Sequence, residues 1–180
     1  IPTGAIIPVT VIASTARTLY RLASAITGRY PATIALPARN ARSFPGGSPF
    51  QIVPVLSGSP ARLWARGDVT NAEEGGTTEA ERSAGDDGAP GELQEYVRVR
   101  LWYDGDGDGT ADDGEDVVFE GTLADLGARE EWFSLTDACV APGTQSVRFR
   151  WDLPSDAPNT VQTDGVSFSL GVAADTSECA

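Results

Sequence analysis

Three segments of this 180-residue chain alternate between apolar and polar side chains, and this pattern limits the possible folds more than any other. The segments run over residues 97–103, 147–153 and 166–172. In each, every second residue is Val, Leu, Phe, Trp or Tyr, and most of the residues between are Arg, Asp or Ser. Successive side chains of a strand point to opposite faces, so the pattern predicts antiparallel strands with one face on a core.

Shorter apolar segments between turn-forming residues bring the number of expected strands to eight. The predicted strands are Thr33–Leu36, Phe50–Leu56, Ala61–Arg66, Tyr96–Tyr103, Val117–Glu120, Glu131–Ser134, Ser146–Leu153 and Gly165–Ala173. A single helix, roughly Thr122–Arg129, interrupts them. We therefore expect an all-β domain over residues 31–180, a jelly-roll-like antiparallel β-sandwich. Residues 70–92 are polar, Gly-rich and acidic, which predicts a long surface loop.

Residues 1–30 differ from the rest and predict an N-terminal arm. Residues 1–13 are apolar and β-branched, and Pro2 and Pro8 favour an extended segment at a sheet edge or outside the parent domain's central strands. Residues 15–27 carry apolar side chains at helical spacing, which predicts a short amphipathic helix. The side chains that could serve as a donor strand for another subunit are Ile6, Ile7, Val9, Val11 and Ile12.

The charges are numerous and unevenly distributed. The formal net charge is −13, all 13 basic residues are arginine, residues 1–67 sum to +7 and residues 68–180 to −20. A body this acidic is a poor binder of nucleic acid, because such binding depends on neutralising phosphates. The chain has no histidine, which excludes His-ligated zinc and Ser–His or Cys–His catalysis. We therefore do not expect an enzyme.

Residues 104–115 have the spacing of a calcium-binding loop. Acidic residues fall at positions 1, 3, 5, 9 and 12 of this segment, and Gly109 at position 6 permits a sharp turn. Calcium prefers six to eight hard oxygen ligands, and alternate residues of a tightly curled loop direct their oxygens inward. The candidate ligands are Asp104, Asp106, Asp108, Thr110 through its carbonyl, Asp112 and Glu115.

The alternative is that an acidic protein uses Asp-Gly turns here without any metal. Seven acids lie within residues 104–116, and charges this dense repel unless a cation neutralises them, which favours calcium. Because the flanking segments are predicted strands, we expect the loop of a β-hairpin rather than a helix–loop–helix sensor. The polar segment 159–164 could supply a second cation site, although a hydrogen-bonded turn is the favoured interpretation.

The two cysteines, Cys139 and Cys179, are too few for a disulfide scaffold and wrongly spaced for zinc. One disulfide is the natural interpretation in a secreted protein, with two reduced thiols as the alternative. No apolar run approaches the roughly 20 residues of a membrane span. The chain begins at Ile1 rather than Met, so we expect a processed protein from which any signal peptide has been removed.

Several segments together resemble the TasA/camelysin-like secreted proteins of halophilic archaea, which are exported with SipW-type signal peptides. They are residues 97–103 with the Asp-Gly loop, 117–126, 149–154 and 159–164, and the cysteine near the C-terminus. The resemblance covers roughly residues 31–180. It implies an extracellular jelly-roll-like sandwich, adaptation to high salt, a Cys139–Cys179 pair and, for relatives, fibres or pili formed by donor-strand complementation. The 30 additional N-terminal residues depart from the family's pattern. Some relatives are described as metalloproteases, but this sequence contains no HExxH motif.

Two functions follow as expectations. The first is a structural subunit of an extracellular filament or pilus, a homopolymer in which residues 5–13 add a strand to the next subunit. The second is a monomeric calcium-binding protein of the cell surface or biofilm matrix, whose arm folds back on its own domain.

Overall fold

The structure, a computed structural model, describes residues 32–37, 50–52, 55–56, 58–86, 88, 90–112 and 114–179. The predicted arm, its helix over 15–27 and the candidate donor strand Ile6, Ile7, Val9, Val11 and Ile12 lie outside the described residues. Those three expectations therefore stay predictions. None of the helices in the described ranges is both long enough and apolar enough to cross a membrane.

Strands dominate the described part of the chain, which confirms the all-β prediction. The strands are β1 (Ala32–Pro37), β2 (Phe50–Ile52), β3 (Val55–Leu56), β4 (Arg62–Glu73), β5 (Arg98–Tyr103), β6 (Val117–Thr122), β7 (Phe133–Ser134), β8 (Gly143–Thr144), β9 (Val147–Asp152) and β10 (Gly165–Asp175). The helices are α2 (Glu79–Ala84), α3 (Leu93–Tyr96), α4 (Leu123–Gly127) and the 3-10 helix η1 (Asn159–Val161).

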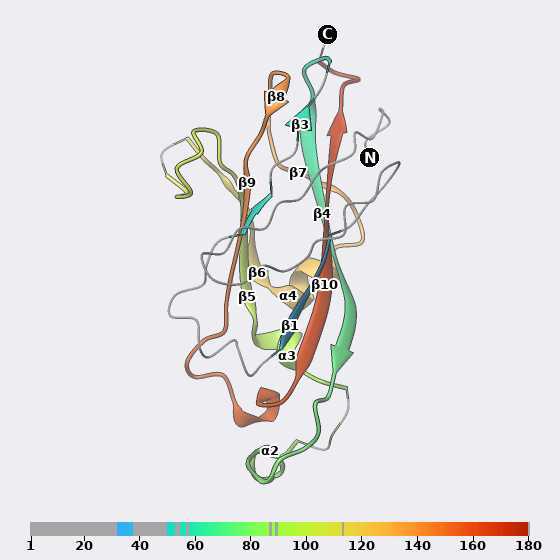
Figure 1. Cartoon of the computed structure of the whole chain (residues 1–180), viewed down its shortest axis with the longest axis vertical. Helices are drawn as coiled ribbons and strands as arrows, with labels where there is room; N and C mark the ends of the chain where they lie inside the picture. The colour runs from blue at the N-terminus through green and yellow to red at the C-terminus, as the bar shows by residue number, and fades with distance from the viewer. Residues whose placement is uncertain are drawn as a thin grey trace.

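The strands form two four-stranded antiparallel sheets and one small pair. The first sheet has the order β1-β10-β4-β7 and the second the order β2-β9-β5-β6, while β3 pairs with β8. The two larger sheets lie face to face (Figure 1). The longest pairing joins β4 to β10, from Arg62 opposite Asp175 to Glu73 opposite Gly165. The helix α2 and the turn that contains η1 lie at one end of the long axis, and the β3–β8 pair lies at the other (Figure 1).

The core lies between the two sheets and consists of the apolar side chains of the alternating segments. Val97, Val99 and Leu101 are buried, as the alternation predicts. Phe149 of the second sheet and Phe168 of the first are also buried, and their ring centroids lie 5.2 Å apart across the interface. The hydrophobic effect of burying these faces holds the layers together, at roughly 25 cal/mol per Å² of apolar surface.

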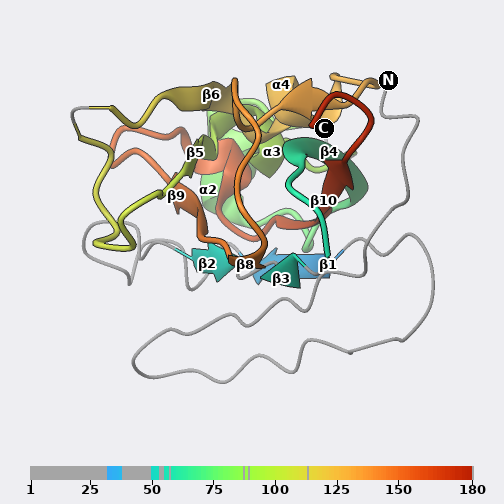
Figure 2. The ribbon, with the colours of Figure 1, turned by 90° about the horizontal axis from the view of Figure 1, so that it is seen from above.

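One side of the molecule is closed by the connection between β6 and β7. Thr122 and Asp125 form a capping box at the start of α4, which confirms the helix expected there. Its Leu123 and Leu126 are buried, and a Cβ placed on Gly67 of β4 would lie 2.4 Å from Leu126 Cγ. Glycine thus allows α4 to pack closely on the first sheet. On the other side of the molecule lie β1 and β2, the outer strands of the two sheets (Figure 2).

The bounds of two predicted strands were wrong. The segment 50–56 is divided between β2 and β3, which belong to different sheets; it contains Pro54, which has no N–H for a ladder. The strand predicted to end at Arg66 continues as β4 to Glu73, because it pairs with β10 along that whole length.

The expectation of a single helix was also wrong. Within the predicted loop 70–92, α2 begins with a capping box formed by Thr78 and Glu81. The helix α3 ends at Tyr96, so β5 begins at Arg98 rather than at Tyr96. The sequence Thr-x-x-Glu at residues 78–81 is the local signal that could have identified α2.

Candidate metal centre

The predicted calcium loop joins two paired strands, as expected. β5 ends at Tyr103 and β6 begins at Val117, and the two strands pair antiparallel. The loop therefore closes a β-hairpin at one edge of the second sheet, apart from the end that carries α2 (Figure 1).

Hydrogen bonds from the loop's own backbone curl it around its aspartates. Asp104 Oδ1 accepts the amides of Gly107 (3.0 Å) and Gly109 (3.4 Å). Asp106 Oδ1 accepts the Asp108 amide at 3.0 Å, and Asp108 Oδ1 accepts the Thr110 amide at 2.7 Å. Gly109 has φ = +86°, the left-handed conformation expected at position 6. Local Asp-Gly chemistry is thus sufficient to shape the turn.

Three of the six predicted ligands form one group. Asp104, Asp106 and Asp108 each place a carboxylate oxygen within 4.8 Å of the other two. Glu115 folds back toward them, because its Oε1 accepts the amides of Gly105 and Asp106. Its Oε2 is buried and has no hydrogen-bond partner in the described part of the chain.

Of the remaining two predicted ligands, Asp112 does not belong to this group of carboxylates, and Thr110 is expected to bind through its backbone carbonyl. Thr110 donates its amide and its hydroxyl to Asp108, and Asp112 is exposed, with its carbonyl accepting the Glu115 amide. The carboxylates that lie close together in this conformation are therefore those at loop positions 1, 3 and 5, with Glu115 beside them.

A basic residue that the sequence reasoning missed lies against the loop. Asp104 is 1% exposed, and its Oδ2 accepts hydrogen bonds from Arg148 Nε and Ser146 Oγ. Arg148 Nη2 also donates to the Gly107 carbonyl at 3.1 Å. Although burial raises the pKa of Asp104, the bonds from Arg148 and Ser146 outweigh it and lower that pKa.

The approach of Arg148 follows from strand register rather than from spacing in the sequence. Tyr103 of β5 lies opposite Val147 of β9, so Ser146 adjoins Asp104; Arg148 lies opposite Trp102, and its long side chain reaches past Tyr103 to the loop. The only sequence signal is the alternation, which places Arg148 on the outward face of β9. The guanidinium neutralises one loop carboxylate, so the density of acids is a weaker argument for calcium than it is from sequence alone.

The pKa values of two other loop carboxylates, Glu115 and Asp108, shift in opposite directions. Burial, with the nearby charges of Asp104 and Asp106, raises the pKa of Glu115. Hydrogen bonds from the Thr110 hydroxyl and amide lower the pKa of Asp108. Asp108 thus stays ionised at neutral pH, and Glu115 presents a buried oxygen with no competing donor. Hard carboxylate oxygens in this arrangement suit a divalent cation such as calcium.

A second group of carboxylates lies at the end of the molecule that carries α2. Two overlapping groups, Glu74–Glu81–Asp164 and Glu74–Asp86–Glu92, each place their oxygens within 4.8 Å of one another. We call these five residues the Asp164 cluster. The sequence predicted a solvated acidic loop and a polar turn here, but Glu81 is 0% and Asp164 1% exposed. The turn itself exists as η1, with the Gln162 amide bonded to the Asn159 carbonyl.

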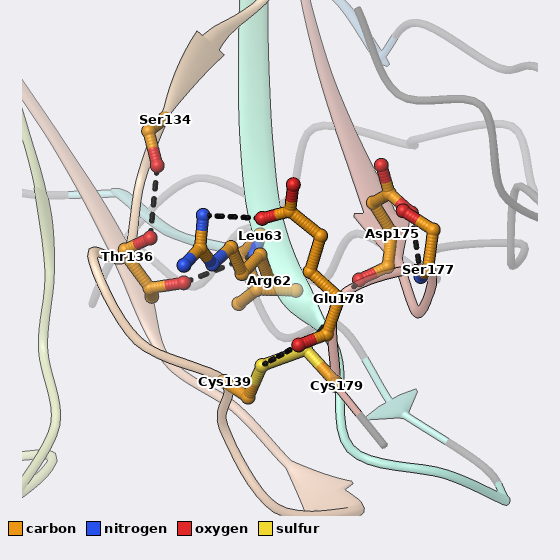
Figure 3. The surroundings of a disulfide bond; sticks show 9 residues. All are labelled: Arg62, Leu63, Ser134, Thr136, Cys139, Asp175, Ser177, Glu178 and Cys179. Atoms are coloured by element: carbon orange, nitrogen blue, oxygen red, sulfur yellow. Dashed lines mark hydrogen bonds and ion pairs between the residues drawn. A yellow bond between two sulfur atoms is a disulfide. The ribbon is translucent and has the colours of Figure 1, made fainter.

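The two cysteines form a disulfide at the opposite end. Cys139 and Cys179 are joined, with their Cα atoms 5.7 Å apart. Figure 3 shows the bridge beside the Arg62–Glu178 ion pair, whose Nη1 and Oε2 atoms are 2.8 Å apart. The bridge attaches the segment after β10 to the segment after β7.

Comparison of the chain with models of known protein families, with curated proteins and with solved structures finds no match.

Proposed function

We propose that this chain is a structural subunit of an extracellular filament, assembled head-to-tail by donor-strand complementation and stabilised by calcium. In such assembly an extended segment of one subunit adds a strand to a sheet edge of the next. A contact of this kind does not close on itself, so it produces filaments. The role is structural rather than catalytic, in keeping with a sequence that contains no histidine.

The observation that carries the proposal is that the two four-stranded sheets have open edges. Among the described strands, the first sheet ends in β1 and β7 and the second in β2 and β6. The N–H and C=O groups along the outer side of an edge strand are a template for another strand. We place the added strand at one of these edges.

The order of the strands supports a jelly roll as the finer description of the fold. The chain crosses from one four-stranded sheet to the other after β1, β2, β4, β6, β7 and β9, leaving β3 and β8 aside. Repeated crossing between two antiparallel sheets is typical of a jelly roll, which contains two Greek keys. Such sandwiches leave edges exposed at their sides, which is the property that strand addition requires.

Residues 6–12 have the composition that an added strand needs. They include Ile6, Val9 and Val11, whose β-branched side chains favour extended backbone. The acid-free first 67 residues carry +7 and the remainder −20, so the basic N-terminal part of one copy is attracted to the acidic body of the next. At 1 M salt the Debye length is only about 3 Å, so strand pairing, rather than this attraction, must dominate in brine.

The calcium component of the proposal rests on the 104–115 loop. Asp106 and Asp108 are exposed and each commits one oxygen to a backbone amide, which leaves a second oxygen for an ion. Glu115 adds its buried Oε2. These oxygens fit calcium, which tolerates irregular sets of carboxylates. When bound, calcium would stiffen the hairpin between β5 and β6.

Deleting residues 1–13 tests the assembly. We expect the full chain to form filaments visible by negative-stain microscopy, and the deletion to give folded monomers with a cooperative thermal transition. Two full-length variants test the inserted strand more closely. Neighbouring side chains of an extended strand point to opposite faces. If Val11 is on the inserted face, Val11→Asp should abolish filaments, and the matched Thr10→Asp should retain them.

Filaments that form abundantly without residues 1–13 would overturn the proposal. A full chain that stays monomeric in the presence of calcium would overturn it as well, and would favour the monomeric calcium-binding surface protein. In that case the arm folds back on its own domain, and its deletion should lower the thermal midpoint of the monomer.

A further inference from the structure

The Asp164 cluster gathers carboxylates from four separate parts of the chain. Glu74 follows β4, Asp86 follows α2, Glu92 precedes α3 and Asp164 precedes β10. The fifth member, Glu81, lies within α2. No sequence spacing relates these residues, since 72 residues separate Glu92 from Asp164. The fold brings them together where α2 and η1 pack against each other (Figure 1).

Three of these carboxylates share one arrangement, in which a backbone amide holds one oxygen. Glu74 Oε1 accepts the Gly76 amide at 3.1 Å, and Asp86 Oδ1 accepts the Gly88 amide at 2.8 Å. Asp164 Oδ2 accepts the Glu92 and Leu93 amides at 2.6 and 3.2 Å. The second oxygen of each is buried and has no hydrogen-bond partner among the residues that the structure describes: Glu74 Oε2, Asp86 Oδ2 and Asp164 Oδ1.

Among the three, Asp164 gives the strongest argument for a bound ion, because this residue is only 1% exposed. An ionised oxygen buried without a partner is strongly unfavourable, and carboxylates that share a site repel one another. No salt bridge to Glu74, Asp86 or Asp164 occurs in the described part of the chain, in contrast to Asp104, which pairs with Arg148. Burial, together with neighbouring acids, raises the pKa of both Glu74 and Asp164.

The backbone around the cluster is held closely in place. A Cβ on Gly75 would lie 1.8 Å from the Thr163 carbonyl oxygen, and one on Gly91 would lie 2.5 Å from that of Glu73. Glycine therefore permits two close approaches that bring the segments carrying Glu74, Glu92 and Asp164 together. Glu81 adds a further link, since its Oε1 accepts the amide and the hydroxyl of Thr163. The carboxylates are thus positioned before any ligand arrives.

We propose that the Asp164 cluster is a second divalent-cation site, separate from the 104–115 loop, and that it binds calcium. Glu74 belongs to both overlapping groups, with Asp164 in one and with Asp86 and Glu92 in the other. Glu74, Asp86 and Asp164 each supply a buried oxygen that has no hydrogen-bond partner in the described part of the chain. Glu81 is a positioning residue, because both of its oxygens already accept hydrogen bonds. A calcium ion here satisfies the buried oxygens and joins the ends of β4 and α2 to the start of β10.

The test uses a parent variant, the full-length chain carrying Asp106→Asn and Asp108→Asn. These substitutions remove the charges of two exposed candidate ligands of the 104–115 loop. We expect isothermal titration calorimetry to detect calcium binding to this parent, and its thermal midpoint to rise by several degrees over that in EGTA. Adding Asp86→Asn or Glu74→Gln should weaken binding by roughly tenfold or more, since each removes one ligand charge but keeps an oxygen for its backbone amide. The matched control Glu79→Gln, an exposed acid of α2 outside the cluster, should bind as the parent does.

A parent chain that shows no calcium heat and no rise in midpoint would overturn the proposal. Undiminished binding in both Asp86→Asn and Glu74→Gln would overturn it too. Cooperative melting of each variant in EGTA establishes that it is folded, so lost binding in a folded variant supports the site. Neither result depends on filament formation, which the deletion of residues 1–13 tests separately.

Discussion

At the scale of single residues, Glu81 shows how a carboxylate can be buried at little cost. Its Oε2 accepts the Thr78 amide at the start of its own helix, and its Oε1 accepts the amide and hydroxyl of Thr163 at 2.8 Å each. Burial alone would raise the pKa of Glu81, but these hydrogen bonds outweigh it and lower the pKa to about 2. The ionised form is therefore the one that the folded state stabilises.

The first prediction concerns the pH dependence of that stabilisation. A carboxylate whose folded pKa is lowered contributes stability that is present above its ordinary value of 4.5 and lost as pH falls toward about 2. Glu81→Gln offers only one acceptor oxygen, so we expect a loss of about 1–3 kcal/mol at pH 7. That difference from wild type should shrink between pH 4.5 and 3, as measured by urea unfolding in EGTA. The control Glu79→Gln should stay within about 0.5 kcal/mol of wild type; an equal loss there would refute the assignment.

At the scale of elements, the loop of the β5–β6 hairpin is anchored by residues outside the hairpin. The loop's internal hydrogen bonds shape its turns, but Asp104 is held by Ser146 and Arg148 at the start of β9. The Asp104 amide also donates to the Ser146 carbonyl at 2.9 Å. Position 1 of the loop is thus part of the sheet, whereas Asp106 and Asp108 extend into solvent. The carboxylates that we propose as calcium ligands are therefore partly separate from the one that anchors the loop to the sheet.

The second prediction follows from this separation. Asp108→Asn should weaken calcium binding at the loop by roughly tenfold or more, because it removes a ligand charge, while the thermal midpoint in EGTA changes little. Calorimetry should be done in a chain that carries Asp86→Asn, which weakens the proposed site at the Asp164 cluster, so that the heat comes mainly from the loop. Asp116→Asn, an exposed acid just beyond the loop, is the matched control. Equal affinities in the two variants would show that the loop is an Asp-Gly turn without a metal.

At the scale of the whole molecule, the two ends are secured differently. One end has the disulfide and the Arg62–Glu178 ion pair (Figure 3). The other end has the Asp164 cluster, with its buried carboxylate oxygens. The long β4–β10 pair runs between them, from Arg62 opposite Asp175 to Glu73 opposite Gly165. The disulfide thus secures one end of this central pair of strands, and the proposed calcium site would secure the other.

The third prediction is the contribution of the disulfide. The bridged residues are 40 apart in sequence, and closing a loop of that length stabilises a fold by on the order of 4 kcal/mol in the chain-entropy model. Cys139→Ser with Cys179→Ser should lower the free energy of unfolding by about that amount, as measured by urea denaturation. Reduction of the wild-type chain should give the same loss. A loss below about 1 kcal/mol would indicate that surface contacts such as Arg62–Glu178 suffice to hold this end.

Much of the local structure could be predicted because its causes lie within a few residues. Alternation identified β5, β9 and β10 and their buried faces, such as that of Val97, Val99 and Leu101. The start of α4 and the turns of the 104–115 loop are likewise set by neighbouring side chains. A capping box at residues 78–81 carried an equally local signal for α2, although the acidic composition around it indicated a loop.

Contacts between distant segments account for the rest. β4 extends beyond Arg66 because β10 supplies a partner almost 100 residues later in the chain, and Arg148 reaches Asp104 because of the β5–β9 register. The Asp164 cluster arises in the same way, from Gly75 and Gly91 packing against other backbone segments. Periodicity and caps are short-range effects that the order of residues expresses directly. Pairing partners and buried clusters depend on the free energy of packing the entire chain, which leaves no pattern in any one segment.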